Sequence, residues 1–136
     1  MTDGLKAYFL SKGYADHVVN AGLARLIRSW ADIARSLSNS DPAYIMYDEF
    51  LNDMDGRRIL EEALSVISPE ERAAVQSQVD EADKVFREST VEISKCIWGE
   101  DNVKKHGYSS EKDWYYYRRP KEVDDSWPSD LIKNEV

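Results

Sequence analysis

The amino-acid sequence predicts an all-α fold, a four- to five-helix bundle with an irregular, aromatic-rich C-terminal segment packed across it. The first observation is a long segment whose large apolar residues recur at intervals of three and four, as on one face of a buried helix. The second is that two later segments, residues 43–67 and 69–97, show similar spacing. The third is the charged fraction of 32%, which suits helices with charged outer faces better than sheets buried on both sides.

The first of these segments, residues 15–37, is predicted to be the central helix on which the others pack. Gly22 and several alanines flank its apolar face and allow neighbouring helices to approach closely. A short helix is expected before it, ending at Gly13. A turn-forming cluster, residues 38–42, ends it, and the Asp-Pro pair of this cluster can start the next helix. The apolar face consists of Val19, Leu23, Leu26, Ile27, Trp30, Ile33 and Leu37.

The segment 43–67 is predicted to contain two helical stretches separated by a kink or break at Asp55 and Gly56. The early apolar stripe is not continued in register by the later one, and glycine weakens a helix interior by about 1 kcal/mol relative to alanine. The early stripe is Tyr44, Tyr47, Leu51 and Met54, and the later one is Ile59, Leu60, Ala63, Leu64 and Ile67.

The segment 69–97 is predicted to be one long helix. It begins at the clearest local signal in the chain, in which Ser68 caps the helix, Pro69 takes the first position and Glu71 bonds back to the cap. A seam of the coiled-coil type then alternates steps of four and three. This seam is Val75, Val79, Ala82, Phe86, Ser89, Ile93 and Cys96.

Residues 100–136 differ in composition from the rest, since they hold few aliphatic but many aromatic residues, and Pro120 and Pro128 break any long helix. This segment cannot form a core alone, so we expect it to wrap the helices and pack its rings on them. The chain is therefore predicted to be a single domain, 1–136, with a helical core over 1–99 and an aromatic and basic strap over 100–136.

The net charge of −8 is concentrated in the middle of the chain, where residues 42–99 hold six basic and thirteen acidic residues. Such a field repels nucleic acid and anionic membranes and attracts cationic partners. The sequence shows no membrane-spanning stretch and no secretion signal. Its single cysteine, Cys96, allows no internal disulfide. We expect a cytoplasmic protein without a membrane or nucleic-acid partner.

The first candidate site is the aromatic and basic run at residues 114–120. Tyrosine, tryptophan and arginine are enriched at interface hot spots because they combine large contact area with a polar group at low entropic cost. The alternative is structural, in that the rings only fix the tail to the helices. The residues predicted to contact a ligand or partner are Tyr108, Trp114, Tyr116, Tyr117, Arg118 and Arg119.

The second candidate site is the acidic cluster that begins with Asp48 and Glu49, a surface on which a basic patch of a partner can dock. Residues 53–62 match part of a helix-loop-helix calcium loop, but its first position is Leu51, which cannot ligate. The sequence has two histidines, one cysteine and no phosphate-binding or nucleophile motif. It therefore predicts no metal, no cofactor and no catalytic residue.

These observations favour a non-catalytic interaction protein, an acidic helical binder or inhibitor of a cationic partner protein, similar to immunity proteins and antitoxins in size, charge and helicity only. The competing hypothesis is a small helical enzyme or ligand-binding domain in which Arg118 or Arg119 grips an anionic group in an aromatic pocket. A deep pocket with convergent polar groups favours this second hypothesis, and a flat aromatic patch favours the first. A third hypothesis is a symmetric homodimer packed through the seam or the tail. The pocket walls in the second hypothesis are Tyr44, Tyr47, Trp114 and Tyr117.

Overall fold

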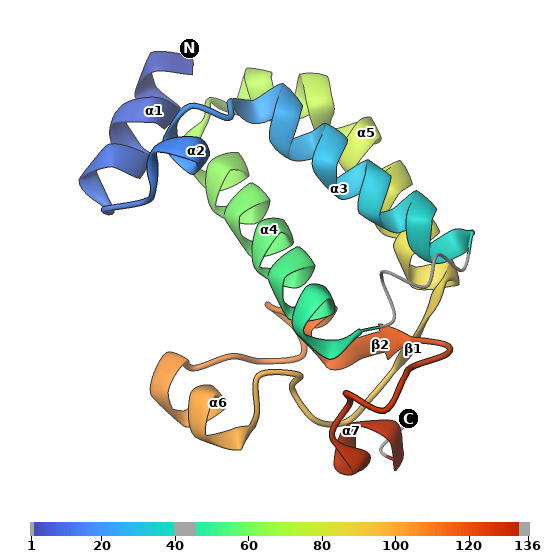
Figure 1. The fold of residues 1–136 in the computed structure, drawn as a ribbon. Helices are drawn as coiled ribbons and strands as arrows, with labels where there is room; N and C mark the ends of the chain where they lie inside the picture. Colours follow the sequence, from blue (N-terminus) through green and yellow to red (C-terminus); the bar gives the residue numbers. More distant parts are fainter. Residues whose placement is uncertain (1, 40–45, 134–136) are drawn as a thin grey trace.

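The computed structural model describes residues 2–39 and 46–133, and it is mainly helical, with 68% helix (Figure 1). The predicted helical class is confirmed, but the described residues form seven α-helices and one two-stranded sheet, more elements than expected. Part of the expected turn, residues 40–42, and Tyr44 lie outside the described ranges. The elements are α1 (Thr2–Ser11), α2 (Asp16–Val19), α3 (Leu23–Ser38), α4 (Tyr47–Val66), α5 (Pro69–Glu88), β1 (Thr90–Glu92), α6 (Glu100–His106), the 3-10 helix η2 (Trp114–Tyr117), β2 (Arg118–Pro120) and α7 (Ser129–Lys133).

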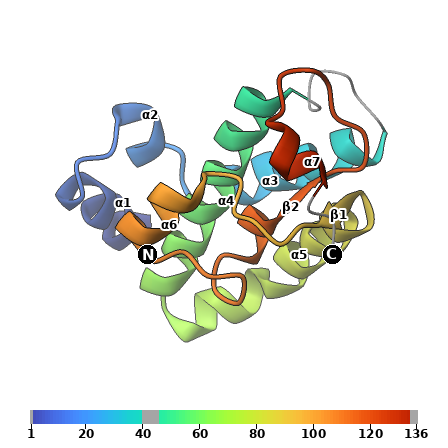
Figure 2. The same cartoon turned by 90° about the horizontal axis from the view of Figure 1, so that it is seen from below.

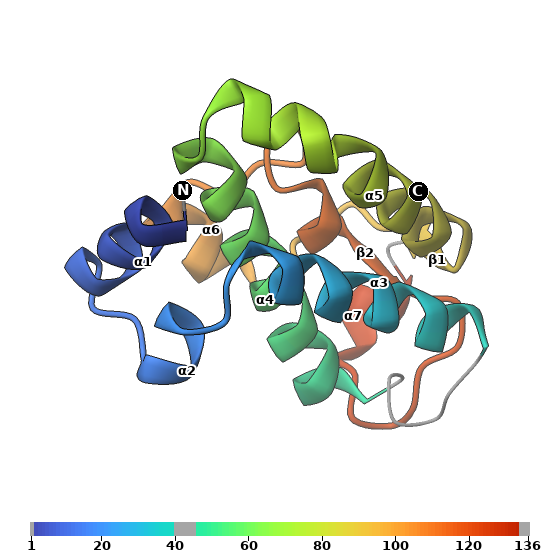
Figure 3. The same ribbon diagram turned by 90° about the horizontal axis from the view of Figure 1, so that it is seen from above.

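The predicted central helix is divided into α2 and α3, so the prediction of one helix over residues 15–37 is wrong at its start. Gly22 lies between the two helices with a φ of 78°, a positive value that favours glycine and interrupts the helix. The apolar periodicity runs through this glycine and conceals the break. From Leu23 onward the expected face is buried or partly buried, with Trp30 only 1% exposed. This face packs against α4 and α5 (Figure 3).

α4 is one unbroken helix of 20 residues, so the helix break that the sequence offered at Asp55 and Gly56, as the alternative to a kink, is wrong. Its buried stripe continues across this position from Met54 to Leu60 by way of Arg57, which is 3% exposed. Hydropathy treats this arginine as a polar interruption and therefore indicates a slip in register that the helix does not have.

α5 begins as predicted but ends earlier. The Ser68 Oγ accepts a hydrogen bond from the Glu71 N–H at 3.1 Å, and Pro69 takes the first turn, so the predicted cap is confirmed. The helix stops at Glu88, and the prediction of one helix over 69–97 is wrong. The chain instead forms β1, which pairs antiparallel with β2 of the distant C-terminal segment.

The C-terminal segment packs across the helices as expected and joins their core. Tyr115, Tyr116 and Leu131 belong to the same buried cluster as Trp30. The Ile97 N–H donates to the Tyr116 carbonyl at 2.8 Å and ties the loop after β1 to η2. In Figure 2 this segment runs in orange and red from α6 past α4 and α5 to α7.

α1 and α2 pack on one side of α4 and form a second, smaller core cluster. In it, Leu5 and Phe9 of α1 meet Ile59 and Ala63 of α4. Gly13 follows α1 with a φ of 76°, which confirms the predicted end of the first helix. Among the described helices, none combines the length and apolarity needed to cross a membrane.

Candidate functional site

The aromatic run predicted as a contact surface is turned largely into the core. Tyr115 and Tyr116 are 1% and 0% exposed. Trp114 packs edge-on against Phe86, with ring centroids 5.8 Å apart, and the Arg87 guanidinium lies 3.9 Å from its ring. Trp114 therefore packs the strap on α5, and the ring of Tyr115 lies 5.2 Å from the Arg57 guanidinium of α4. These contacts correspond to the structural alternative that the sequence left open, and the run forms no flat aromatic patch.

Arg118 and Arg119 are held by oxygen atoms of the protein itself. Arg118 donates through Nε to the Thr90 Oγ1 at 2.8 Å and through Nη2 to the carbonyls of Thr90 and Arg87, both at 3.2 Å. Arg119 is buried and donates through Nη1 to the Pro120 carbonyl at 2.8 Å. Both guanidinium groups anchor the strap, so their geometry does not support a role in gripping an anionic ligand.

Tyr108 lines an open groove of about 520 Å³ between α4 and α6. The Tyr117 hydroxyl donates to the Tyr108 carbonyl at 3.5 Å and so supports this part of the chain. The groove, which we call the α4–α6 groove, brings charged, amide and aromatic side chains together. Its lining residues are Asp55, Arg58, Trp98, Asn102, His106 and Tyr108.

The acidic candidates Asp48 and Glu49 are exposed on the first turn of α4. The strap reaches the same place, because the Tyr47 N–H donates to the Ser126 Oγ at 2.9 Å and the two residues before Ser126 are acidic. Within the described residues, none of these four acids forms an ion pair with lysine or arginine. We call them the acidic patch, which consists of Asp48, Glu49, Asp124 and Asp125.

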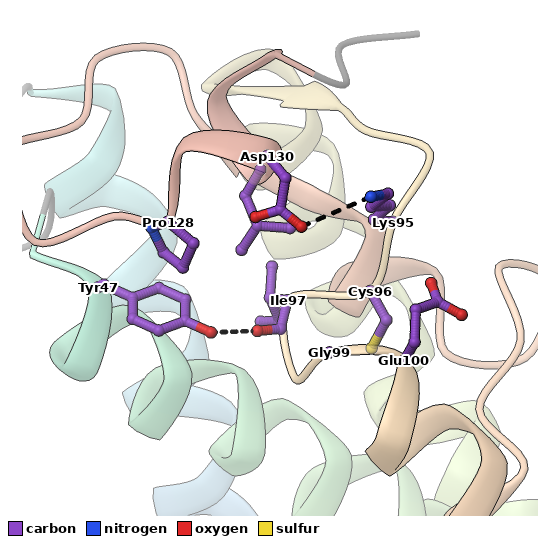
Figure 4. A pocket seen from close by; sticks show the side chains of 9 residues that line it. Tyr47, Lys95, Cys96, Ile97, Gly99, Glu100, Pro128 and Asp130 are labelled. Atoms are coloured by element: carbon purple, nitrogen blue, oxygen red, sulfur yellow. Dashed lines mark hydrogen bonds and ion pairs between the residues drawn. The ribbon is translucent and has the colours of Figure 1, made fainter.

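Cys96 is one of the residues that line a small cavity of about 80 Å³ beside α7 (Figure 4). Lys95 and Asp130 lie at its rim, with Nζ and Oδ2 3.5 Å apart. Cys96 is 0% exposed, and burial raises the pKa of its thiol to about 11. The thiol is therefore protonated and shielded near neutral pH, which is typical of a structural cysteine rather than a nucleophile.

Tyr47 and Trp114, two of the residues expected to wall an aromatic pocket, pack against different neighbours. Tyr47 lines the small cavity and packs edge-on against Trp127, with ring centroids 5.1 Å apart. Trp114 packs on α5 instead, as described above. Tyr44 lies outside the described residues. Polar groups converge instead in the α4–α6 groove, which neither Tyr47 nor Trp114 lines.

The acidic residues of α4 do not form the calcium loop that residues 53–62 resemble, because this range is helical throughout. Two of its carboxylates, Asp55 and Glu62, face the Arg58 guanidinium at 3.1 Å and 3.8 Å. In the part of the chain that the structure describes, no group of three or more His, Cys, Asp and Glu residues is arranged to hold a metal ion.

Sequence reasoning misses Arg58, Trp98 and Asn102 as groove residues. Asn102 and His106 are four residues apart and share a face of the short helix α6, a signal that is visible once Gly107 is recognised as its C-terminal cap. No local pattern in the sequence brings that face of α6 to α4.

The fold and the site together show a mainly helical protein with an acidic patch and an aromatic, polar groove on its described surface. Neither the patch nor the groove includes a serine, threonine or cysteine nucleophile. Comparison of the chain with protein-family models, with curated proteins and with solved structures finds no match.

Proposed function

We propose that the chain is a non-catalytic binding protein that docks a cationic partner protein on its acidic patch. The observation that carries this proposal is the placement of Asp48 and Glu49, which are exposed at one end of α4 beside two further acids of the strap. Because no described lysine or arginine pairs with these four carboxylates, their field acts on a basic surface that approaches this end of the molecule. We also propose a cytoplasmic location, since the single cysteine, Cys96, can form no internal disulfide and so requires no oxidising compartment.

The first turn of a helix also favours carboxylates for a purely structural reason. The macrodipole makes each of them stabilising by about 0.3–1 kcal/mol. α5 begins with acidic residues as well, including the exposed Glu70. A control can therefore remove the same amount of charge at a distance from the patch, by replacing two exposed acids of α5, Glu70 and Glu88.

The test compares two double variants. The first combines Asp48→Asn with Glu49→Gln, and the matched control combines Glu70→Gln with Glu88→Gln. Each protein is immobilised and offered a lysate of the source cells at low salt, and the association rate of the retained basic protein is then measured at rising salt. We expect wild type and control to bind alike and the patch variant to associate about tenfold more slowly at low salt, since charges at the rim of an interface act mainly on the association rate. Equal losses in the two variants, or no retained basic protein, would contradict the proposal.

A further inference from the structure

The α4–α6 groove has the size and the composition of a small-molecule site. Its volume of about 520 Å³ falls within the range of roughly 300–1,000 Å³ that is usual for ligand pockets. It combines flat apolar faces with a few polar groups, as such pockets do. The groove shares none of its lining residues with the acidic patch.

The α4 side of the groove presents a donor beside an acceptor. The Nε and Nη2 atoms of Arg58 both lie 3.1 Å from the Asp55 Oδ1, and Nη1 donates to the Tyr14 hydroxyl at 3.3 Å. Glu62 also faces this guanidinium, with Oε2 3.8 Å from Nη1. Glu62 lies outside the groove lining, but Asp55 and Glu62 together outweigh the single guanidinium, so the α4 side of the groove carries a net negative charge and disfavours an anionic ligand.

The opposite side of the groove is aromatic and is held from beneath by a buried ring. Tyr116 makes edge contacts with Trp98 and Tyr108, with ring centroids 6.1 Å and 4.9 Å apart. His106 stacks on Tyr108 at 5.3 Å with an angle of 28° between the rings. Because Tyr116 is fully buried, it orients both lining rings, and preoriented aromatic faces stack flat ligands at low entropic cost.

Two buried polar atoms next to the groove have no hydrogen-bond partner among the described residues, the Trp98 Nε1 and the Tyr116 hydroxyl. Trp98 lines the groove, and Tyr116 contacts the lining rings of Trp98 and Tyr108 from within the core. A buried donor without a partner is destabilising, and a ligand that accepts its hydrogen bond removes this cost. Asn102 uses its Nδ2 to bond the Trp98 carbonyl at 2.8 Å, and its amide oxygen has no partner within the described chain.

We infer that the α4–α6 groove binds a small, uncharged, planar heteroaromatic molecule of the nucleobase or nucleoside class. The ring stacks on Trp98 and Tyr108, and its polar edge meets Asp55 and Arg58. Donors and acceptors side by side on one edge are the chemical signature of a nucleobase, and single bases are recognised by stacking together with such edge contacts. Because the α4 wall is negative, a nucleotide binds more weakly than its nucleoside. This inference goes beyond the proposed function and stands or falls separately from it.

The test is an NMR titration of the ¹⁵N-labelled full chain with the common nucleosides at low millimolar concentration. The indole N–H resonance of Trp98, assigned with Trp98→Phe, should shift saturably with at least one of them. Asn102→Ala should weaken binding about fivefold. It removes the amide oxygen of Asn102 and with it one hydrogen bond to the ligand, worth about 1 kcal/mol. The matched control Lys105→Ala, which changes an exposed residue of the same helix outside the groove lining, should leave binding unchanged.

Three outcomes would overturn the inference: no saturable shift with any nucleoside, equal weakening by Asn102→Ala and Lys105→Ala, or tighter binding of a nucleoside monophosphate than of its nucleoside. Circular dichroism checks that each variant keeps the native helical spectrum. If Asn102→Ala loses it, His106→Ala replaces it with the same expected weakening, because His106 is an exposed lining residue.

Discussion

Arg57 on α4 and Asp83 on α5 form a buried ion pair with two contacts, Nε to Oδ1 and Nη2 to Oδ2, each 3.1 Å long. The Oδ1 of Asp83 also accepts a hydrogen bond from the Trp30 Nε1 of α3 at 2.8 Å. The Arg57 guanidinium lies 5.2 Å from the ring centroid of Tyr115 in the strap. One carboxylate therefore links the three long helices, and its partner reaches the C-terminal segment.

Asp83→Ala should lower the free energy of unfolding by about 3–5 kcal/mol, because it leaves the buried Arg57 without its main partner and the Trp30 indole without an acceptor. Urea unfolding followed by circular dichroism measures this change. The matched control is Asp32→Ala, which breaks the exposed pair with Arg35 and should cost no more than about 0.5 kcal/mol. Equal costs for the two variants would show that the buried pair does not join the helices energetically.

Asp53 makes the stability of the fold depend on pH. Its Oδ2 is buried without a hydrogen-bond partner among the described residues, and burial, with a smaller effect of Glu49, raises the pKa of the carboxyl from 3.8 to about 7. The folded protein therefore keeps a proton that the unfolded chain has already lost. At a pH below the pKa of Asp53 in the unfolded chain, this group makes its full contribution to the free energy of unfolding. The contribution is lost as the pH rises to about 7, the pKa of the folded state.

Asp53→Asn should consequently raise the free energy of unfolding at mildly alkaline pH by roughly 1–2 kcal/mol, a value reduced for partial solvent screening. It should also flatten the pH dependence between weakly acidic and alkaline buffers. Urea titrations across this range measure both effects. Asp125→Asn, at an exposed loop position, should change neither of them. A variant at position 53 that is less stable than wild type at alkaline pH would refute this account.

The sequence predicts helices well where spacing, caps and turn residues agree, as at Gly13 and Ser68. It fails where a charge takes a core position. Arg57 is buried because its partner Asp83, 26 residues away, is brought to it by the packing of α4 on α5, and no local pattern reveals that pairing. The early end of α5 has a similar cause, since β1 depends on β2 and therefore on a contact distant in sequence.

The candidate site shows the same limit. The residue types of the aromatic run are those of an interface, but residue type does not specify which rings become buried, and Tyr116 lies entirely inside. Tyr108 does line the groove, whereas its neighbours Trp98 and Arg58 join it only because α6 lies beside α4. Local periodicity predicts a face of one helix and carries no information about which distant segment covers it.

Cys96 should be nearly unreactive in the native protein. Its side chain is fully buried, and the pKa of about 11 leaves little thiolate near neutral pH. Modification by a thiol-specific aromatic disulfide, followed by absorbance, should therefore proceed at the rate at which the protein unfolds and should accelerate with urea. A rate in the native protein close to that of the urea-unfolded chain would contradict this burial.

Two substitutions of Tyr116 measure separately what its ring and its hydroxyl group contribute to the free energy of unfolding. Tyr116→Phe should raise the free energy of unfolding by about 1 kcal/mol, because it removes a buried hydroxyl that has no partner among the described residues and keeps the ring. Tyr116→Ala should lower it by about 3–5 kcal/mol, because it leaves a cavity beneath Trp98 and Tyr108. Thermal and urea unfolding of both variants measure the two effects, and a destabilised Tyr116→Phe would mean that the hydroxyl is bonded in solution.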